Sequence, residues 1–357
     1  MRILQLIDSL EAGGAERMAI NYANALSEKI AFSALVATRK EGVLKATVGN
    51  HVDYLFLKKE RTLDLRAIRK LLIYCKSNNI EIIHAHSTSV FLAVLVKILK
   101  PSLKIVWHDH YGNSEFLVDR STLSLKIILK FCAGAISVNS ILLEWIQKEL
   151  NFKNSIYLPN FVLEENYEKP ITTLKGQSGM RIVCLANLRE QKNHILLIEV
   201  AKKLKENFPN WSFHFIGKDF QDEISESVRN LITAKELEEY VFLYDSCSDV
   251  QSVLKQANIG VLSSKSEGLP VALLEYGLAG LGVVVTDVGE ISKVISTNLN
   301  GILVRSGNVD DFCQALTILI SDQEKRDRMG FELTKTVKAK YTKDAVLNSY
   351  LNWIRRC

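Results

Sequence analysis

Short apolar runs alternate with amphipathic stretches through the first 160 residues of the chain. Each run is four or five residues long, which is typical of a buried strand, and most lead into a stretch with helical spacing. This alternation predicts an α/β fold with a parallel sheet and helices on both faces. The predicted strands are Ile3–Ile7, Ser33–Ala37, Val52–Phe56, Ile80–His84, Lys104–Trp107 and Gly134–Val138.

The same pattern restarts near residue 181, after a polar segment at residues 164–179 that is typical of a linker. We therefore predict two Rossmann-like domains, residues 1–162 and 163–342, which face each other across a cleft. In such folds ligands bind at the carboxyl ends of the strands. The strands predicted for the second domain are Arg181–Leu185, Trp211–Ile216, Val241–Tyr244, Ile259–Leu262 and Gly282–Thr286.

One loop of the second domain carries the clearest chemistry. After the strand Ile259–Leu262, the run Ser-Ser-Lys-Ser-Glu-Gly-Leu-Pro leads into a helix, because Gly268 permits a tight turn and Pro270 suits a first helical position. The free backbone N–H groups of a helix start favour a phosphate. Glu275 follows roughly 7 Å further along the helix, where its carboxylate could accept hydrogen bonds from a ribose. The alternative is that Glu275 interacts only with the helix dipole.

The two glutamates of this segment, separated by seven residues around Gly-Leu-Pro, resemble the signature of family 4 glycosyltransferases, which are retaining enzymes of the GT-B fold. The resemblance extends through nearly the whole chain. It implies that Glu267 contacts hydroxyls of the donor sugar and that Glu275 holds the ribose. It also implies that the last helix crosses back, so that residues 343–357 join the first domain. Phe161 departs from the family's usual Pro-Asn-Gly. Sugar and diphosphate would be held by the backbone of Gly268, Leu269, Pro270, Val271 and Ala272.

A Gly-Gly pair follows the first predicted strand and precedes a helix. Gly13 and Gly14 would let the backbone approach a phosphate or sugar closely, although many α/β proteins have such a turn without a ligand. The loop is similar to the Gly-Gly-Ala-Glu loop of the family. This similarity implies that both glycines contact donor or acceptor, with Glu16 as a helix cap.

The first loop of the second domain contains a lysine at its end. Lys192 is placed to neutralise a departing diphosphate, and a solvated loop lysine is the alternative. In the family an arginine usually stands where this chain has Asn187, and Arg189 is the nearest substitute. The resemblance also places the nucleobase at the ends of two further strands, beside Gly217 and Tyr244.

Four of the seven histidines form two pairs, His84 with His86 and His108 with His110, each following a strand-like run. Strand alternation would direct each pair to one side, which permits a metal site with Asp109 as a further ligand. A polar wall of the cleft is the competing interpretation. The sequence has no Asp-x-Asp motif, which metal-dependent glycosyltransferases use, and we expect no metal. The resemblance implies that one histidine of the second pair faces the reacting sugar, and counting from the strand favours His110 over His108. It also implies that His86 and Ser87 lie near the acceptor.

Composition and charge narrow the class of protein. The 357 residues, 47% of them hydrophobic, suffice for two buried cores. No apolar run reaches the ~18 residues of a membrane span, and no secretory signal is recognisable, so we expect a cytoplasmic protein. The six cysteines are widely spaced and without a Cys-x-x-Cys motif, as reduced thiols usually are.

The positive charge is concentrated in the first half. Residues 1–160 carry 21 lysines and arginines against 14 acidic residues, whereas the rest carries 24 against 26. This excess is compatible with peripheral contact with anionic lipids at the inner face of the cytoplasmic membrane, although solvated helix faces explain it equally well. We expect no nucleic-acid partner, because the lysines lack interleaved aromatic residues and no nucleic-acid-binding module is recognisable.

We therefore expect an enzyme that moves a sugar from a UDP- or GDP-sugar to a saccharide or polyprenyl-linked acceptor, without a cofactor, in surface polysaccharide or glycolipid assembly. Lys192 and the backbone after Glu267 would stabilise the charge on the departing diphosphate. His110 is the third predicted catalytic residue. Two alternatives remain open. A sugar-nucleotide epimerase of the same fold would need no acceptor, and a catalytically silent sugar-nucleotide-binding subunit is slightly favoured by the departure at Asn187.

Overall fold

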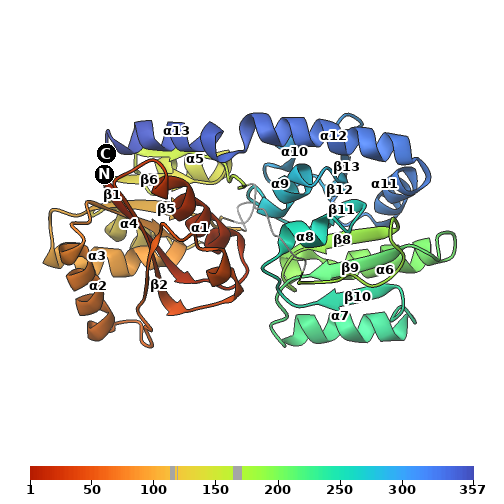
Figure 1. Ribbon diagram of the computed structural model, residues 1–357, viewed down its shortest axis with the longest axis horizontal. Coiled ribbons are helices and arrows are strands. Elements are labelled where there is room, and N and C mark those ends of the chain that lie inside the picture. Colours follow the sequence, from red (N-terminus) through yellow and green to blue (C-terminus); the bar gives the residue numbers. More distant parts are fainter. Residues whose placement is uncertain (113–116, 119, 164–170) are drawn as a thin grey trace. The chain divides into compact units, whose positions relative to one another are not determined.

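The chain forms two compact units, each a parallel sheet with covering helices (Figure 1). Unit 1 comprises Met1–Phe161 and Lys343–Cys357, and unit 2 comprises Val162–Thr342. The sequence analysis placed the boundary one residue later, after residue 162. The computed structural model describes residues 1–112, 117–118, 120–163 and 171–357. Residues 164–170 of the predicted linker lie outside these ranges.

Unit 1 is built on a seven-stranded parallel sheet in the order β3-β2-β1-β4-β5-β6-β7. Its strands are β1 Arg2–Ser9, β2 Phe32–Lys40, β3 Asp53–Phe56, β4 Ile82–His86, β5 Lys104–Asp109, β6 Gly134–Ser137 and β7 Ser155–Tyr157. Its helices are α1 Gly14–Ser27, α2 Leu65–Ser77, α3 Val90–Leu99, α4 Leu123–Leu129, α5 Ser140–Lys148 and α13 Lys343–Ile354. The six predicted strands are present, and the seventh, β7, was missed because it has only three residues, all half-buried.

The two faces of this sheet differ in chemistry because side chains alternate along each strand. One face carries Leu4, Leu6, Ile83 and Trp107, which join a hydrophobic core with side chains of α2, α3, α4 and α5. On the opposite face, Ile7, Leu35 and Ala37 pack against α1. The central part of that face instead carries polar side chains. Gln5, His84, His86 and His108 are buried there.

The last helix, α13, packs on unit 1 beside α1 (Figure 1). In the sequence it is separated from the rest of unit 1 by the whole of unit 2. Tyr350, Leu351 and Ile354 are buried. Gly134 of β6 leaves room for the Trp353 ring, since a Cβ at this position would lie 2.6 Å from that ring. The predicted return of the last helix to the first domain is thus confirmed.

Unit 2 is built on a six-stranded parallel sheet in the order β10-β9-β8-β11-β12-β13. Its strands are β8 Arg181–Leu185, β9 Ser212–Ile216, β10 Val241–Tyr244, β11 Ile259–Leu262, β12 Gly282–Thr286 and β13 Ile302–Val304. Its helices are α6 His194–Lys205, α7 Glu223–Ala234, α8 Val250–Leu254, α9 Val271–Leu278, α10 Ile291–Val294, α11 Val309–Ser321 and α12 Gln323–Lys340. The short strand β13 was not predicted.

Two further details bear on the site and its surroundings. Pro270 is the N-cap of α9, with φ −68° and ψ 124°, and the helix begins one residue later than predicted, at Val271. Among the described residues, no helix combines the length and apolar composition needed to cross a membrane.

Candidate active site

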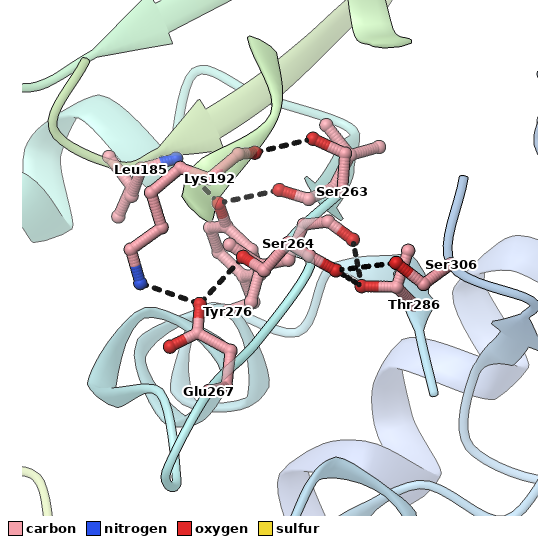
Figure 2. A network of polar contacts seen from close by, with 10 residues as sticks. Leu185, Lys192, Ser263, Ser264, Glu267, Tyr276, Thr286 and Ser306 are labelled. Carbon is pink, nitrogen blue, oxygen red and sulfur yellow. Dashed lines mark hydrogen bonds and ion pairs between the residues drawn. The ribbon is translucent and has the colours of Figure 1, made fainter. Parts of the chain in front are cut away.

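An ion pair lies beside the carboxyl ends of two neighbouring strands of unit 2 (Figure 2). Lys192 follows β8 in a short 3₁₀ turn, and Glu267 lies in the loop after β11. The Lys192 Nζ atom is 2.6 Å from Glu267 Oε1, and the Ser264 hydroxyl donates to the same oxygen at 2.7 Å. The carboxylate side chain is 6% exposed and the lysine 20%. Glu267 is therefore held in one position, while Lys192 is partly open to solvent.

Hydroxyl groups fix the two loops to each other. Ser263 Oγ donates to the carbonyl oxygens of Lys192, at 2.8 Å, and of Asn193, at 3.0 Å. Thr286 Oγ1, at the end of β12, donates to the Ser264 carbonyl at 2.8 Å (Figure 2). Ser306 Oγ reaches the same carbonyl at 3.2 Å. The ion pair is thus supported from three strand ends.

The start of α9 lies directly after Glu267. Gly289 has a φ of +59°, and a Cβ there would lie 2.2 Å from the Glu267 carbonyl oxygen. Glycine is therefore required at this close approach. The Glu290 backbone N–H donates to the Gly268 carbonyl at 2.9 Å. The turn that precedes Leu269, Pro270, Val271 and Ala272 is thereby fixed by a neighbouring loop.

Glu275, the second glutamate of the motif, lies on α9 next to the buried Tyr276. Tyr276 Oη accepts a hydrogen bond from the Leu185 backbone N–H at 2.7 Å and lies 3.2 Å from the Val261 carbonyl oxygen. Burial raises the pKa of Tyr276 well above its usual value, and the nearby charges of Glu275 and Glu267 add to the effect. Both carboxylates thus lie near one neutral phenol, which links α9 to β8 and β11.

The other predicted donor contacts of unit 2 have structural partners. Asn187 Oδ1 accepts from the Lys218 backbone N–H at 2.8 Å, and Gly217 packs so tightly on this loop that a Cβ would lie 2.3 Å from the Ala186 oxygen. Arg189 is exposed and its guanidinium lies 4.7 Å from the centre of the Phe220 ring. Asn187 therefore shapes the loop. Tyr244, on the edge strand β10, accepts from the Lys175 backbone N–H at 2.8 Å.

The Gly-Gly loop of unit 1 ends β1 and opens α1. Gly13 is the N-cap of α1 and has no capping side chain. Glu16 folds back over it, because a Cβ on Gly13 would lie 2.2 Å from Glu16 Oε2, and Ser9 Oγ donates to Glu16 Oε1 at 2.9 Å. Gly14 is exposed at the first helical position.

The paired histidines lie on neighbouring strands and form a connected group. His84, His86 and His108 lie in β4 and β5. His86 and His108 were predicted to follow the strands, but both strands extend two residues further than predicted. His86 Nε2 lies 2.9 Å from Gln5 Oε1, and His86 Nδ1 lies 2.9 Å from His110 Nε2. A third contact, of 3.1 Å, joins His84 Nε2 to His108 Nδ1.

Helices α1 and α13 close this group. Tyr350 Oη lies 3.1 Å from His84 Nδ1, and the Tyr22 ring meets the His84 ring edge-on with centroids 5.0 Å apart. Burial lowers the pKa of His110 from 6.5 to about 3 and lowers the pKa values of His84, His86 and His108 well below 6.5. The four imidazoles are therefore neutral near pH 7.

A metal site was the alternative interpretation of these histidines. His84, His86 and His108 do offer one nitrogen each within 4.8 Å of one another. Most of the ring nitrogens of these three histidines already face another side chain of the group. Among them, His108 Nε2 is the one buried nitrogen without a hydrogen-bond partner. Asp109 is instead bound by both guanidinium nitrogens of Arg120, at 2.6 and 2.9 Å. The geometry therefore favours a hydrogen-bonded wall over a metal centre.

Several residues of these networks were missed by sequence reasoning. Ser264 was seen only as part of the loop motif, and Thr286 and Ser306 carried no signal. Ser306 also lines a cavity of about 410 Å³ with Asp287, Leu303, Val304 and Arg305. Gln5 did carry a signal, as a lone polar residue inside an apolar strand. Tyr22 could not have been found, because helical spacing does not show which side chain reaches the sheet.

Comparisons with known proteins agree with this architecture. The profile of the glycosyl transferases group 1 matches residues 170–335, and that of Glycosyltransferase Family 4 matches residues 12–163. An uncharacterized glycosyltransferase of Haemophilus influenzae is 23% identical over 325 residues, 88% of each chain. UDP-Gal:alpha-D-GlcNAc-diphosphoundecaprenol alpha-1,3-galactosyltransferase of Escherichia coli is 24% identical over 283 residues, 73% of this chain and 71% of that one.

Solved structures show the same fold. HepE of Anabaena in complex with UDP-glucose superposes with a TM-score of 0.78 over 100% of both chains, at 15% identity. A glycosyltransferase from Rickettsia africae superposes with a TM-score of 0.76 over 98% of this chain and 97% of that one, at 16% identity. With two parallel-sheet domains and both halves matched by family profiles, this chain belongs to the family 4 glycosyltransferases and has the GT-B fold.

Proposed function

We propose that this protein is a retaining glycosyltransferase that moves a sugar from a nucleoside-diphosphate sugar to a saccharide or lipid-linked saccharide acceptor. The observation that carries the proposal is the pair of Lys192 and Glu267, which lies at two strand ends and directly before the backbone that opens α9. A diphosphate at this place would meet an ammonium group and the free N–H groups of a helix start.

The proposed mechanism depends on charge. Breaking the glycosidic bond to the diphosphate leaves negative charge on the phosphate, and Lys192 would turn from Glu267 to this phosphate. Ser264 would continue to hold the Glu267 carboxylate, which would accept hydrogen bonds from sugar hydroxyls. Glu275 would accept from the ribose. The acceptor hydroxyl attacks from the side of the leaving group and gives its proton to the departing phosphate, without a metal ion.

The histidine group would provide uncharged hydrogen-bonding groups for the sugar. Gln5 Oε1 only accepts hydrogen bonds, so the proton of His86 lies on Nε2, with the amide oriented as in the structure. His86 Nδ1 then accepts from His110 Nε2–H, which leaves His110 Nδ1 with a lone pair for a sugar hydroxyl. Gln5 and His86 would thus position the His110 ring.

The nature of the acceptor is proposed from the relatives. The E. coli relative acts, by its name, on a sugar linked to diphosphoundecaprenol, and another relative, in Staphylococcus aureus, is a poly(ribitol-phosphate) alpha-N-acetylglucosaminyltransferase. Surface polysaccharide or glycolipid assembly on the cytoplasmic side of the membrane fits both names. Cytoplasmic nucleotide sugars would be the donors.

A thermal-shift screen of UDP- and GDP-sugars tests donor binding, because a ligand that binds the folded state raises the melting temperature. The donor found should then be consumed in the presence of saccharide acceptors, and NMR of the product should show the anomeric configuration of the donor. Release of nucleotide without an acceptor would favour the epimerase. Donor binding without turnover would favour the silent subunit, and an inverted product would contradict retention.

A further inference from the structure

Three neighbouring helices of unit 1 present large apolar side chains to solvent. Helix α3 packs against both α2 and α4, and all three cover the same face of the sheet. Six of these side chains are at least 52% exposed. Single exposed apolar residues are common, but exposed apolar groups gathered on neighbouring elements are typical of an interaction surface. The six are Leu65 and Ile73 on α2, Ile98 and Leu99 on α3, and Leu123 and Ile127 on α4, with Phe91 on α3 as a less exposed seventh.

The same three helices carry only positive charge. They contain six lysines and arginines and no acidic residue. On α2, Arg69 lies four residues from both Leu65 and Ile73, so basic and apolar side chains share one stripe. On α4, Lys126 lies three residues after Leu123 and next to Ile127. Arg69 and Lys126 are exposed and form no ion pair within the described residues.

The outer helices of unit 2 provide an internal comparison. Helices α6, α7 and α11 contain four basic and five acidic residues, and Lys203 of α6 pairs with Asp310 of α11 at 2.5 Å. Their exposed large apolar side chains are Ile195 and Ile318, at 37% and 40%. Mixed charge with few apolar groups is the ordinary surface of a water-exposed domain. The α2–α4 face of unit 1 is different in both respects.

We propose that the outward face of α2, α3 and α4, called here the basic apolar face, docks on an anionic lipid bilayer. Leucine and isoleucine side chains would enter the boundary between head groups and acyl chains, while arginine and lysine side chains contact lipid phosphates. A lipid-linked acceptor would then be met at the surface on which it lies. In this respect the inference rests on the proposed function, although lipid binding itself can be measured without any transfer reaction.

Charge distinguishes a bilayer from a second copy of the chain. In a symmetric dimer the same patch contacts itself, so the basic residues of the two copies would face each other and repel. An anionic surface is complementary to every charge on this face. Asp64, which caps α2 through the Arg66 and Ala67 backbone N–H groups, lies at its edge and is already occupied.

The test is flotation of the full-length protein with vesicles of phosphatidylcholine, with and without phosphatidylglycerol, at low and high salt. We expect binding only to the anionic vesicles, weakened by salt. The variant Arg69→Glu/Lys126→Glu should bind at least about tenfold more weakly. Each basic residue near an anionic membrane raises the affinity about fivefold, and the variant removes two of them. Leu123→Ser/Ile127→Ser should also weaken binding while leaving the salt dependence.

The matched control is Lys202→Glu/Arg328→Glu, which makes the same change of charge on exposed helices of unit 2. Equal loss of binding in both charge variants would show general attraction and overturn the proposal, as would equal binding to neutral vesicles. If the protein does not bind vesicles but forms a dimer, and Leu123→Ser/Ile127→Ser dissociates that dimer, the face would instead contact a second copy of the chain. Transfer to a water-soluble acceptor should be unchanged in Arg69→Glu/Lys126→Glu, so failure of lipid binding and failure of the proposed function are separable.

Discussion

The polar side chains at the two sheets differ in kind. In unit 2 an ammonium group and a carboxylate meet at 2.6 Å, with hydroxyl groups around them. In unit 1, four imidazoles, an amide and two phenols contact one another, and burial keeps the imidazoles neutral. Charges that remain partly open to solvent can be redirected to a charged ligand. Buried neutral groups suit hydroxyl recognition, and they also make unit 1 sensitive to acid.

The largest expected effect is the response to acid. The unfolded chain binds a proton at each histidine below pH 6.5, but folded His110 resists protonation until about pH 3. Stability is therefore full above pH 6.5 and falls as the pH drops, by about 1.4 kcal/mol per pH unit for each such group.

Unit 1 has four such histidines, whereas unit 2 has His194 and His214, with pKa values lowered by burial to about 4 and 3. Hydrogen exchange followed by mass spectrometry between pH 7 and 5, corrected for intrinsic rates, should show unit 1 opening first. Earlier opening of unit 2 would mean that the histidine group is not neutral as described.

The next effect is on catalysis. Lys192→Ala should lower kcat by roughly 10²–10³-fold, the usual effect of removing a preorganised group that stabilises transition-state charge. Lys265→Ala is the control, because Lys265 is an exposed lysine two residues before Glu267 and pairs with Glu190 at 3.0 Å. Similar rates in the two variants would contradict the assigned role of Lys192. A melting curve of each variant excludes unfolding as the cause.

A smaller effect is expected at the histidine group. Gln5→Met keeps the volume of the side chain but removes the acceptor of His86 Nε2–H, so that His110 loses its fixed tautomer. We expect kcat to fall about tenfold, which is less than the roughly 10²–10⁴-fold that a general acid or base itself contributes. The ¹⁵N shifts of His110 provide a second measurement. An unchanged Nδ1 signal in the variant would show that Gln5 does not orient the ring.

The smallest effects separate Asn187 from Arg189. Asn187→Ala should destabilise unit 2 by about 1 kcal/mol, because the Lys218 backbone N–H loses its acceptor. Arg189→Ala should leave stability unchanged, since the side chain is exposed. If Arg189 contacts the diphosphate, the donor KM rises several-fold in this variant. If the KM stays within error of the wild-type value, Arg189 does not contact the diphosphate, and Lys192 is then the cationic side chain of this loop that binds the donor.

The fold could be predicted from the sequence because its strands are buried apolar runs. The strands β7 and β13 were missed because three residues are too few to show a period. The site was predicted as residue types and not as contacts. Lys192 and Glu267 were each named, but strand order decides that their loops are neighbours. The contact between Tyr350 and His84 spans 266 residues of sequence, so no local pattern could reveal it.

The most direct test of the central claim is calorimetric titration of the wild-type protein and of Lys192→Ala with nucleoside diphosphates and monophosphates, using UDP with UMP and GDP with GMP. The account predicts that the wild-type protein prefers the diphosphate of one base by about tenfold or more, as expected for a charge-assisted contact to the second phosphate. It predicts that this preference disappears in Lys192→Ala while the monophosphate binds as before. A preference that persists in Lys192→Ala, or no binding of either diphosphate to the wild-type protein, would contradict it.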